Sequence, residues 1–176
     1  MRLLLMALAL AALSSTGSAL AQSPPPAQPP SGGTPEQMPF ATPYGTSITA
    51  DRAVHVANAV LAEAAKHPTW QFAITVVDTA GDLVYFYRMP NTQIASINIS
   101  QGKARTAVRY RRETRLFYNA EETGHPYVGT LDPTLVASPG GYPLIENGKI
   151  IGAVGCSGGT GDQDATVCAA GAATIK

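Results

Sequence analysis

Basic side chains are concentrated in one short stretch of this 176-residue chain, where six of the twelve Lys and Arg residues fall between positions 103 and 115. Arg105, Arg109 and Arg112 follow an i, i+4, i+7 spacing, which places them on one face of a helix. Guanidinium and ammonium groups bind carboxylates through charge-assisted hydrogen bonds. Lys103, Arg105 and Arg109 are therefore candidate anion-binding residues, whereas we expect Arg112 to be solvated. The alternative for the whole stretch is a solvated helix face, or intersubunit salt bridges with Glu113, Glu121 and Glu122.

The three histidines are the candidate ligands for a bound metal centre. His55 lies next to the apolar face of an expected helix and is the first choice. His125 lies in a loop and is the second. His67 ends the helix that carries His55, where a cation is favoured by the helix dipole. Each histidine has an alternative as a solvent-facing or hydrogen-bonded residue, and other oxygen or sulfur donors are Tyr85, Tyr87, Met89 and Tyr110.

A glycine-rich loop follows the apolar run that begins at Ile150. Thr160 and Gln163 have the spacing of a capping box, which predicts a helix that begins at about Gly161. A helix N-terminus with exposed amides can hold an anionic or polar ligand. An ordinary capped turn between strand and helix explains the same residues. Because the loop lacks the lysine and the spacing of a P-loop, nucleotide binding is not expected.

Cys156 and Cys168 are the only cysteines. In an oxidising compartment they are expected to form a disulfide between the strand and the helix that follows it. The alternative is two small buried side chains.

Catalytic motifs are weak. Ser157 does not lie in a nucleophile-elbow sequence, and no cluster with metal-ligand spacing is present in the sequence. The formal net charge of zero argues against a dedicated nucleic-acid binder. The sequence therefore favours ligand binding over catalysis.

Helices and strands do not alternate regularly along the part that must position these residues, 47–176. Two hairpin turns are expected, at Asp78–Asp82 and at Asn147–Gly148. The pattern predicts one α+β domain. The expected helices cover about 50–66, 97–112, 114–121 and 162–175, and the expected strands cover 70–77, 83–89, 135–137, 142–145 and 149–155.

The N-terminal part has two further segments. Residues 1–21 combine a positive start, an apolar core and a small-x-small cleavage pattern, which is typical of a signal peptide. Residues 22–46 are rich in proline and predict a disordered tether. We therefore expect a mature form without a transmembrane helix, in a periplasmic or secreted location.

An ordered series of short motifs resembles a known family. The series comprises Ala73–Asp78 with Gly81, Tyr87-Arg88-Met89, Lys103–Ala107, Gly140–Leu144, Asn147-Gly148 with Ile151–Gly155, and Ser157-Gly158-Gly159 with Gln163-Asp164. It is similar to the GlcG/HbpS-like family, also called the haem-degrading or haem-binding domain. The resemblance implies an α+β domain with a five-stranded antiparallel sheet flanked by helices. It also implies a homo-oligomer, and haem as the ligand of some members.

Together these observations predict an extracytoplasmic domain that binds a small ligand, with haem the first candidate. We expect His55 to bind the iron, with His125 as the alternative, and Lys103, Arg105 and Arg109 to bind the propionates, in a pocket beside the first two helices. Two alternatives stay open. One is an enzyme or accessory protein acting on haem or a small hydroxy acid, and the other is an oligomeric structural protein.

Overall fold

The computed structural model describes residues 40–176. The expected signal peptide (1–21) and most of the expected tether (22–46) lie outside these residues. The described end of the tether segment lies against the domain: the Pro43 carbonyl accepts a hydrogen bond from the Ile150 amide at 2.8 Å, and the Gly45 amide donates to the Ile150 carbonyl at 2.8 Å. Within the described part, no helix is both long enough and apolar enough to cross a membrane.

An antiparallel sheet with the strand order β2-β1-β4-β3 forms the centre of the domain. β1 (Ala73–Val77) is an unbroken apolar run and is buried along its whole length, as a central strand requires. The hairpin turn to β2 (Leu83–Arg88) is closed by Asp78, whose carboxylate accepts hydrogen bonds from two turn amides. Asn147 and Gly148 both have positive φ and connect β3 (Gly141–Glu146) to β4 (Lys149–Ser157). Both predicted hairpins are confirmed.

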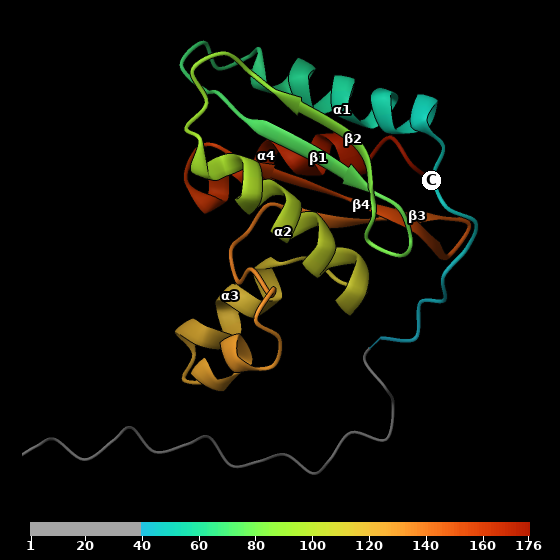
Figure 1. Cartoon of the computed structure of the whole chain (residues 1–176), viewed down its shortest axis with the longest axis vertical. Helices are drawn as coiled ribbons and strands as arrows, with labels where there is room; N and C mark the ends of the chain where they lie inside the picture. Colours follow the sequence, from blue (N-terminus) through green and yellow to red (C-terminus); the bar gives the residue numbers. More distant parts are fainter. Residues whose placement is uncertain (1–39) are drawn as a thin grey trace, which may run out of the picture. The chain divides into compact units, whose positions relative to one another are not determined.

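Helices cover both faces of the sheet (Figure 1). α1 (Ala50–Ala64) and α4 (Gly161–Ala172) pack on one face, around a core that includes Ile74, Val154 and Val167. α2 (Ala95–Tyr110) packs on the other face through its small residues Ala104 and Ala107. α3 (Arg115–Glu122) and the short 3-10 helix η1 (Pro126–Thr130) follow α2 and pack on each other at the edge of the domain. The α+β class is confirmed.

The expected fifth strand is wrong, because residues 135–137 are irregular and the sheet of the described residues has four strands. The amides of this segment bond elsewhere. The Leu135 amide donates to the Asp132 carbonyl at 3.0 Å, and the Val136 amide donates to the Thr106 hydroxyl at 3.0 Å. Because these two backbone amides donate to Asp132 and Thr106, they are not available to pair with a strand. The segment therefore lies along α2 and does not extend the sheet.

Candidate functional site

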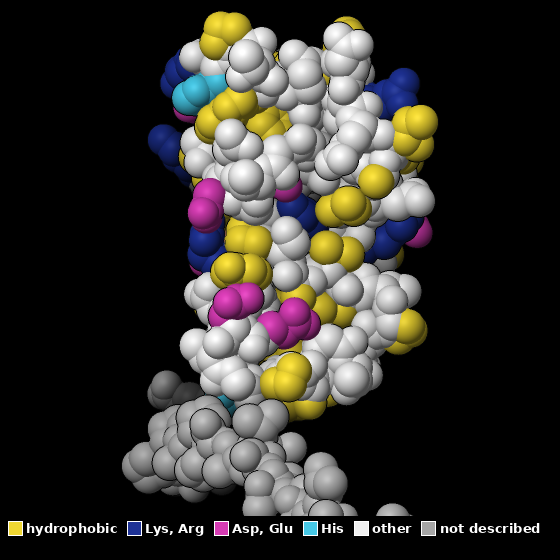
Figure 2. Space-filling view, turned by 90° about the vertical axis from the view of Figure 1, so that its left-hand side faces the viewer, with side chains coloured by type: hydrophobic (Ala, Val, Ile, Leu, Met, Phe, Trp, Pro, Cys, Tyr) yellow, Lys and Arg dark blue, Asp and Glu magenta, His cyan; other side chains and the backbone are white. Residues whose placement is uncertain are grey.

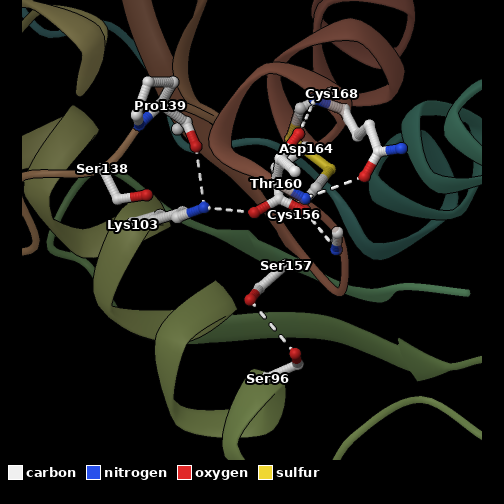
Figure 3. Close-up of polar contacts among 12 residues, drawn as sticks. Ser96, Lys103, Ser138, Pro139, Cys156, Ser157, Thr160, Asp164 and Cys168 are labelled. Carbon is white, nitrogen blue, oxygen red and sulfur yellow. Dashed lines mark hydrogen bonds and ion pairs between the residues drawn. A yellow bond between two sulfur atoms is a disulfide. The ribbon is translucent and has the colours of Figure 1, made fainter.

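Lys103 is the most deeply buried charge in the described part of the chain, with 1% of its surface exposed. It extends from α2 past the end of the sheet to α4, where its Nζ lies 2.6 Å from Oδ2 of Asp164 (Figure 3). The same ammonium group donates to the Pro139 carbonyl at 2.7 Å. Asp164 is itself 3% exposed. The pair therefore connects the helices of the two faces around the end of the sheet.

Glycines allow this pair to form. Gly140 has φ +114°, and a Cβ there would meet the side chain of Asp164. A Cβ on Gly141 would meet the backbone carbonyl of Lys103. Burial lowers the pKa of Lys103 and raises the pKa of Asp164, because each charge loses its water, while the contact between them opposes both shifts. Because Lys103 is enclosed and paired, it does not face a pocket in which it could bind an external carboxylate.

Hydroxyl groups continue the polar row along the buried side of α2. Ser100 shares a hydrogen bond with Thr75 of β1 at 2.9 Å. Figure 3 shows the next bond of the row, in which Ser96 accepts from Ser157 of β4 at 3.2 Å. Each buried hydroxyl thus has a partner, which gives these serines a structural role.

The disulfide predicted from the sequence is confirmed. Cys156 of β4 and Cys168 of α4 are bonded, with their Cα atoms 5.6 Å apart (Figure 3). Both side chains lie in the apolar core between the sheet and its helices.

The glycine-rich loop is a capped turn. The Thr160 hydroxyl accepts from the Gln163 amide at 3.3 Å, and the Thr160 amide donates to Oε1 of Gln163 at 2.8 Å. The Gly159 amide donates to Oδ1 of Asp164 at 3.0 Å. The amides of Gly159, Thr160 and Gln163 are thus occupied by the protein's own oxygens, which favours the capped turn over an anion site.

Arg105 and Arg109 lie on the exposed side of α2, where they line a hollow of about 540 Å³ with the irregular segment 133–136. Nε of Arg105 donates to the Gly81 carbonyl at 3.2 Å. Arg109 forms an ion pair with Asp132 at 3.0 Å and donates to the Thr134 hydroxyl at 2.7 Å. These arginines hold the loops on either side of α2. On the face drawn in Figure 2, basic side chains likewise lie close to acidic ones and form no continuous patch.

The expectation that Arg112 shares the helix face of Arg105 and Arg109 is wrong. α2 ends at Tyr110, and Arg111 takes the left-handed conformation with φ 56°, which turns the chain away from the helix axis. The guanidinium of Arg112 then lies over the ring of Phe40 at 3.7 Å and over the ring of Phe117 at 4.4 Å. Its Nε is buried without a hydrogen-bond partner within residues 40–176. Burial also lowers the pKa of Arg112.

Arg112 forms part of a pocket of about 430 Å³ between α3 and η1, here called the α3–η1 pocket. His125 lines it as well, with the apolar side chains of Leu116, Phe117 and Val128. Tyr127 and Leu131, which complete the apolar lining, are 59% and 57% exposed. The pocket combines an imidazole, a guanidinium with no ion-pair partner among the described residues, and an apolar wall.

His55 lies apart from the basic residues. It is exposed on α1, and α1 packs on the opposite face of the sheet from α2. The expected pocket beside both helices, with His55, Arg105 and Arg109 together, is therefore not formed within the described chain. His67, expected at a helix end, stacks on Trp70 with ring centroids 3.7 Å apart.

Comparisons with known proteins agree with this fold. Residues 48–173 match the model of the family described as "Haem degrading protein HbpS-like". The chain belongs to this family. Protein GlcG of Escherichia coli (strain K12) is 41% identical over 105 residues, which cover 58% of this chain and 78% of that protein.

Two solved structures share this fold. The structure described as the PduOC:Heme complex superposes on this HbpS-like chain with a TM-score of 0.68, at 25% identity, over 74% of this chain and 96% of that chain. The crystal structure of HbpS gives a TM-score of 0.68 at 26% identity, over 75% of this chain and 92% of that chain. Of these two proteins, PduOC was solved in complex with haem.

The sequence left a signal for two features that we did not predict from it, the buried pairing of Lys103 with Asp164 and the place of Arg112 in a pocket. Lys103 lies four residues before the buried Ala107, on the packed face of its helix, where a buried ammonium group needs a carboxylate. Asp164 follows the buried strand β4 through a glycine-rich turn. We expected Arg112 to be solvated, but the apolar pair Leu116-Phe117 follows it closely in the sequence and lines the same pocket. The rotation of Arg112 into the pocket depends on the backbone conformation of Arg111, which periodicity does not reveal.

Proposed function

We propose that this HbpS-like protein binds haem in the α3–η1 pocket, with His125 as the iron ligand and Arg112 as the partner of a propionate. The observation that carries the proposal is that both side chains line one pocket of about 430 Å³, which also has an apolar wall. The PduOC:Heme structure, at TM-score 0.68, supports haem as the ligand.

The chemistry of the pocket suits a flat, mainly apolar molecule with carboxylate groups. Haem requires an axial donor, apolar contact on its faces, and cations for its propionates. Phe117 and Val128 offer the apolar contact, while exposed Tyr127 and Leu131 extend it at the surface. Arg112 forms no ion pair with the described residues, so a propionate at its guanidinium would give this cation the partner that it lacks.

We further propose that the protein works outside the cytoplasm, in the periplasm or as a secreted protein, and as a homo-oligomer. The signal-like sequence at residues 1–21 supports the location. The disulfide between Cys156 and Cys168 is consistent with an oxidising compartment. His55 stays the alternative iron ligand, because an exposed histidine on α1 is open to a ligand held by a second copy.

Hemin titration of the chain from residue 22 onward tests the proposal. We expect a saturable shift of the Soret band. The His125→Ala variant should change the position of the band, and Arg112→Gln should weaken binding by roughly tenfold, which is the value of one hydrogen bond to a charged group.

His55→Ala is the matched control, because it removes another exposed histidine, which lies on α1 and does not line the α3–η1 pocket. It should bind hemin as the wild type does. If His55→Ala alone abolishes the spectrum, the iron ligand is on α1. If no saturable shift occurs in the wild type, the protein does not bind haem.

A further inference from the structure

Three loops meet at one end of the sheet, away from α3 and η1. Strand register brings them together: Ala73 at the start of β1 pairs with Arg88 at the end of β2 and with Ser157 at the end of β4. The segments beyond these residues are 67–71, 89–93 and 158–163. All three lie on the left-hand side of Figure 1.

These loops enclose a pocket of about 380 Å³ that shares no lining residue with the α3–η1 pocket. Its lining is unusual because the described residues that form it include no charged side chain. The polar side chains and the indole that line it are those of Thr69, Trp70, Gln71, Asn91, Thr92, Gln93 and Gln163.

Hydrogen-bonding capacity in this pocket is largely unused within residues 40–176. The side-chain amides of Gln71, Asn91 and Gln93 have no partner in the described chain, and neither has the indole N–H of Trp70. Gln163 uses its oxygen to accept from the Thr160 amide at 2.8 Å, which leaves its NH₂ group to donate. Several donors and acceptors therefore converge on one hollow.

The pocket walls are held firmly. His67 stacks on Trp70, and the Trp70 amide donates to the His67 carbonyl at 2.9 Å. A Cβ on Gly158 would meet the Gln71 carbonyl, and one on Gly159 would meet the Gln163 side chain. The glycines thus let the loops approach closely, which gives this glycine pair a role in shaping the pocket.

We propose that this pocket binds a neutral polyhydroxylated ligand of about monosaccharide size. A hydroxyl group both donates and accepts, and so do the side-chain amides of Gln71, Asn91 and Gln93. Trp70 adds an apolar surface for the C–H groups of such a ligand. A charged ligand finds no counter-ion here, and leaving its charge unpaired in a pocket is costly.

Fluorescence of Trp70 tests the proposal directly, because it is the single tryptophan of the chain. The probes are D-glucose, D-xylose and myo-inositol, with D-gluconate and D-glucosamine as charged molecules of similar size. We expect a saturable change with at least one neutral probe, with a Kd in roughly the millimolar range that a ligand of this size reaches. The charged probes should bind at least about tenfold more weakly. If no neutral probe binds, or if the charged probes bind equally well, the proposal is wrong.

Two variants locate the binding. Gln93→Leu removes an amide from an exposed lining residue and should weaken binding by about fivefold, the value of one neutral hydrogen bond. Gln101→Leu makes the same change on α2, outside the pocket, and should leave binding unchanged. Amide NMR shifts of Gly158 and Gly159 on adding the neutral probe give a second measurement, and shifts confined to other segments would overturn the assignment. Hemin binding is independent of these outcomes, since the two pockets share no residue.

Discussion

The ammonium group of Lys103 and the carboxylate of Asp164 have lost nearly all contact with water, and each depends on the other for its charge to be tolerated. Replacing one partner leaves a buried charge alone, which typically costs roughly 3–5 kcal/mol of folding free energy. Replacing both with neutral residues removes this penalty. We therefore expect the pair to fix how the two helix layers meet and to add little net stability.

We expect Lys103→Met to lower the free energy of unfolding by roughly 3–5 kcal/mol. The double variant Lys103→Met with Asp164→Asn should recover most of the loss, because the side-chain amide oxygen introduced at position 164 would still accept from the Gly159 amide. Urea unfolding of the wild type, both single variants and the double variant measures the coupling. A loss in the double variant equal to the sum of the losses in the two single variants would show that the pair is not coupled.

At the level of elements, the sequence predicted correctly the turns and helix caps that depend on residues close together in the chain. The Thr160–Gln163 capping box and the Asn147-Gly148 turn are formed as expected because their residues interact within a few positions. The missing fifth strand depends on distant contacts. Segment 135–137 bonds to Thr106 of α2, which only the folded chain brings near. For the same reason the sequence identified His125 and Arg112 but not that they share a pocket.

The loop from Asp132 to Thr134 gives an element-level prediction for pH. Two hydrogen bonds from Thr134, with Arg109 nearby, hold the pKa of Asp132 below its ordinary value of 3.8. A carboxylate with a lowered pKa stabilises the fold above its unfolded-state value, and this contribution is lost as the pH falls through the lower, folded-state value. We expect the loop to leave α2 only below pH 3.8.

Carboxyl NMR titration measures this pKa. Thr134→Val, which removes the hydroxyl donor at nearly constant size, should raise it toward 3.8. Thr166→Val, which removes a hydroxyl of α4 that donates to the Asp162 carbonyl, is the control and should leave the Asp132 titration unchanged. An unchanged Asp132 pKa in the Thr134 variant would contradict the assignment.

For the whole molecule, the sheet with α1, α2 and α4 forms the packed body, while α3 and η1 pack mainly on each other. A unit with few core contacts opens locally more often than the core does. The proposed haem pocket is made by this unit, together with Arg112 just after α2. Ligand binding should therefore be visible as a change in local stability there.

Hydrogen exchange tests this arrangement across the chain. Without ligand, amides of residues 115–130 should exchange faster than those of β1 and β4. Hemin at about 100 times its Kd should slow exchange in 115–130 by up to roughly a hundredfold, because a ligand that binds only the closed form stabilises it by about 2.7 kcal/mol. His125→Ala should remove most of this protection, since it deletes the proposed iron ligand. Protection centred on α1 around His55 would instead place the haem on the opposite face of the sheet.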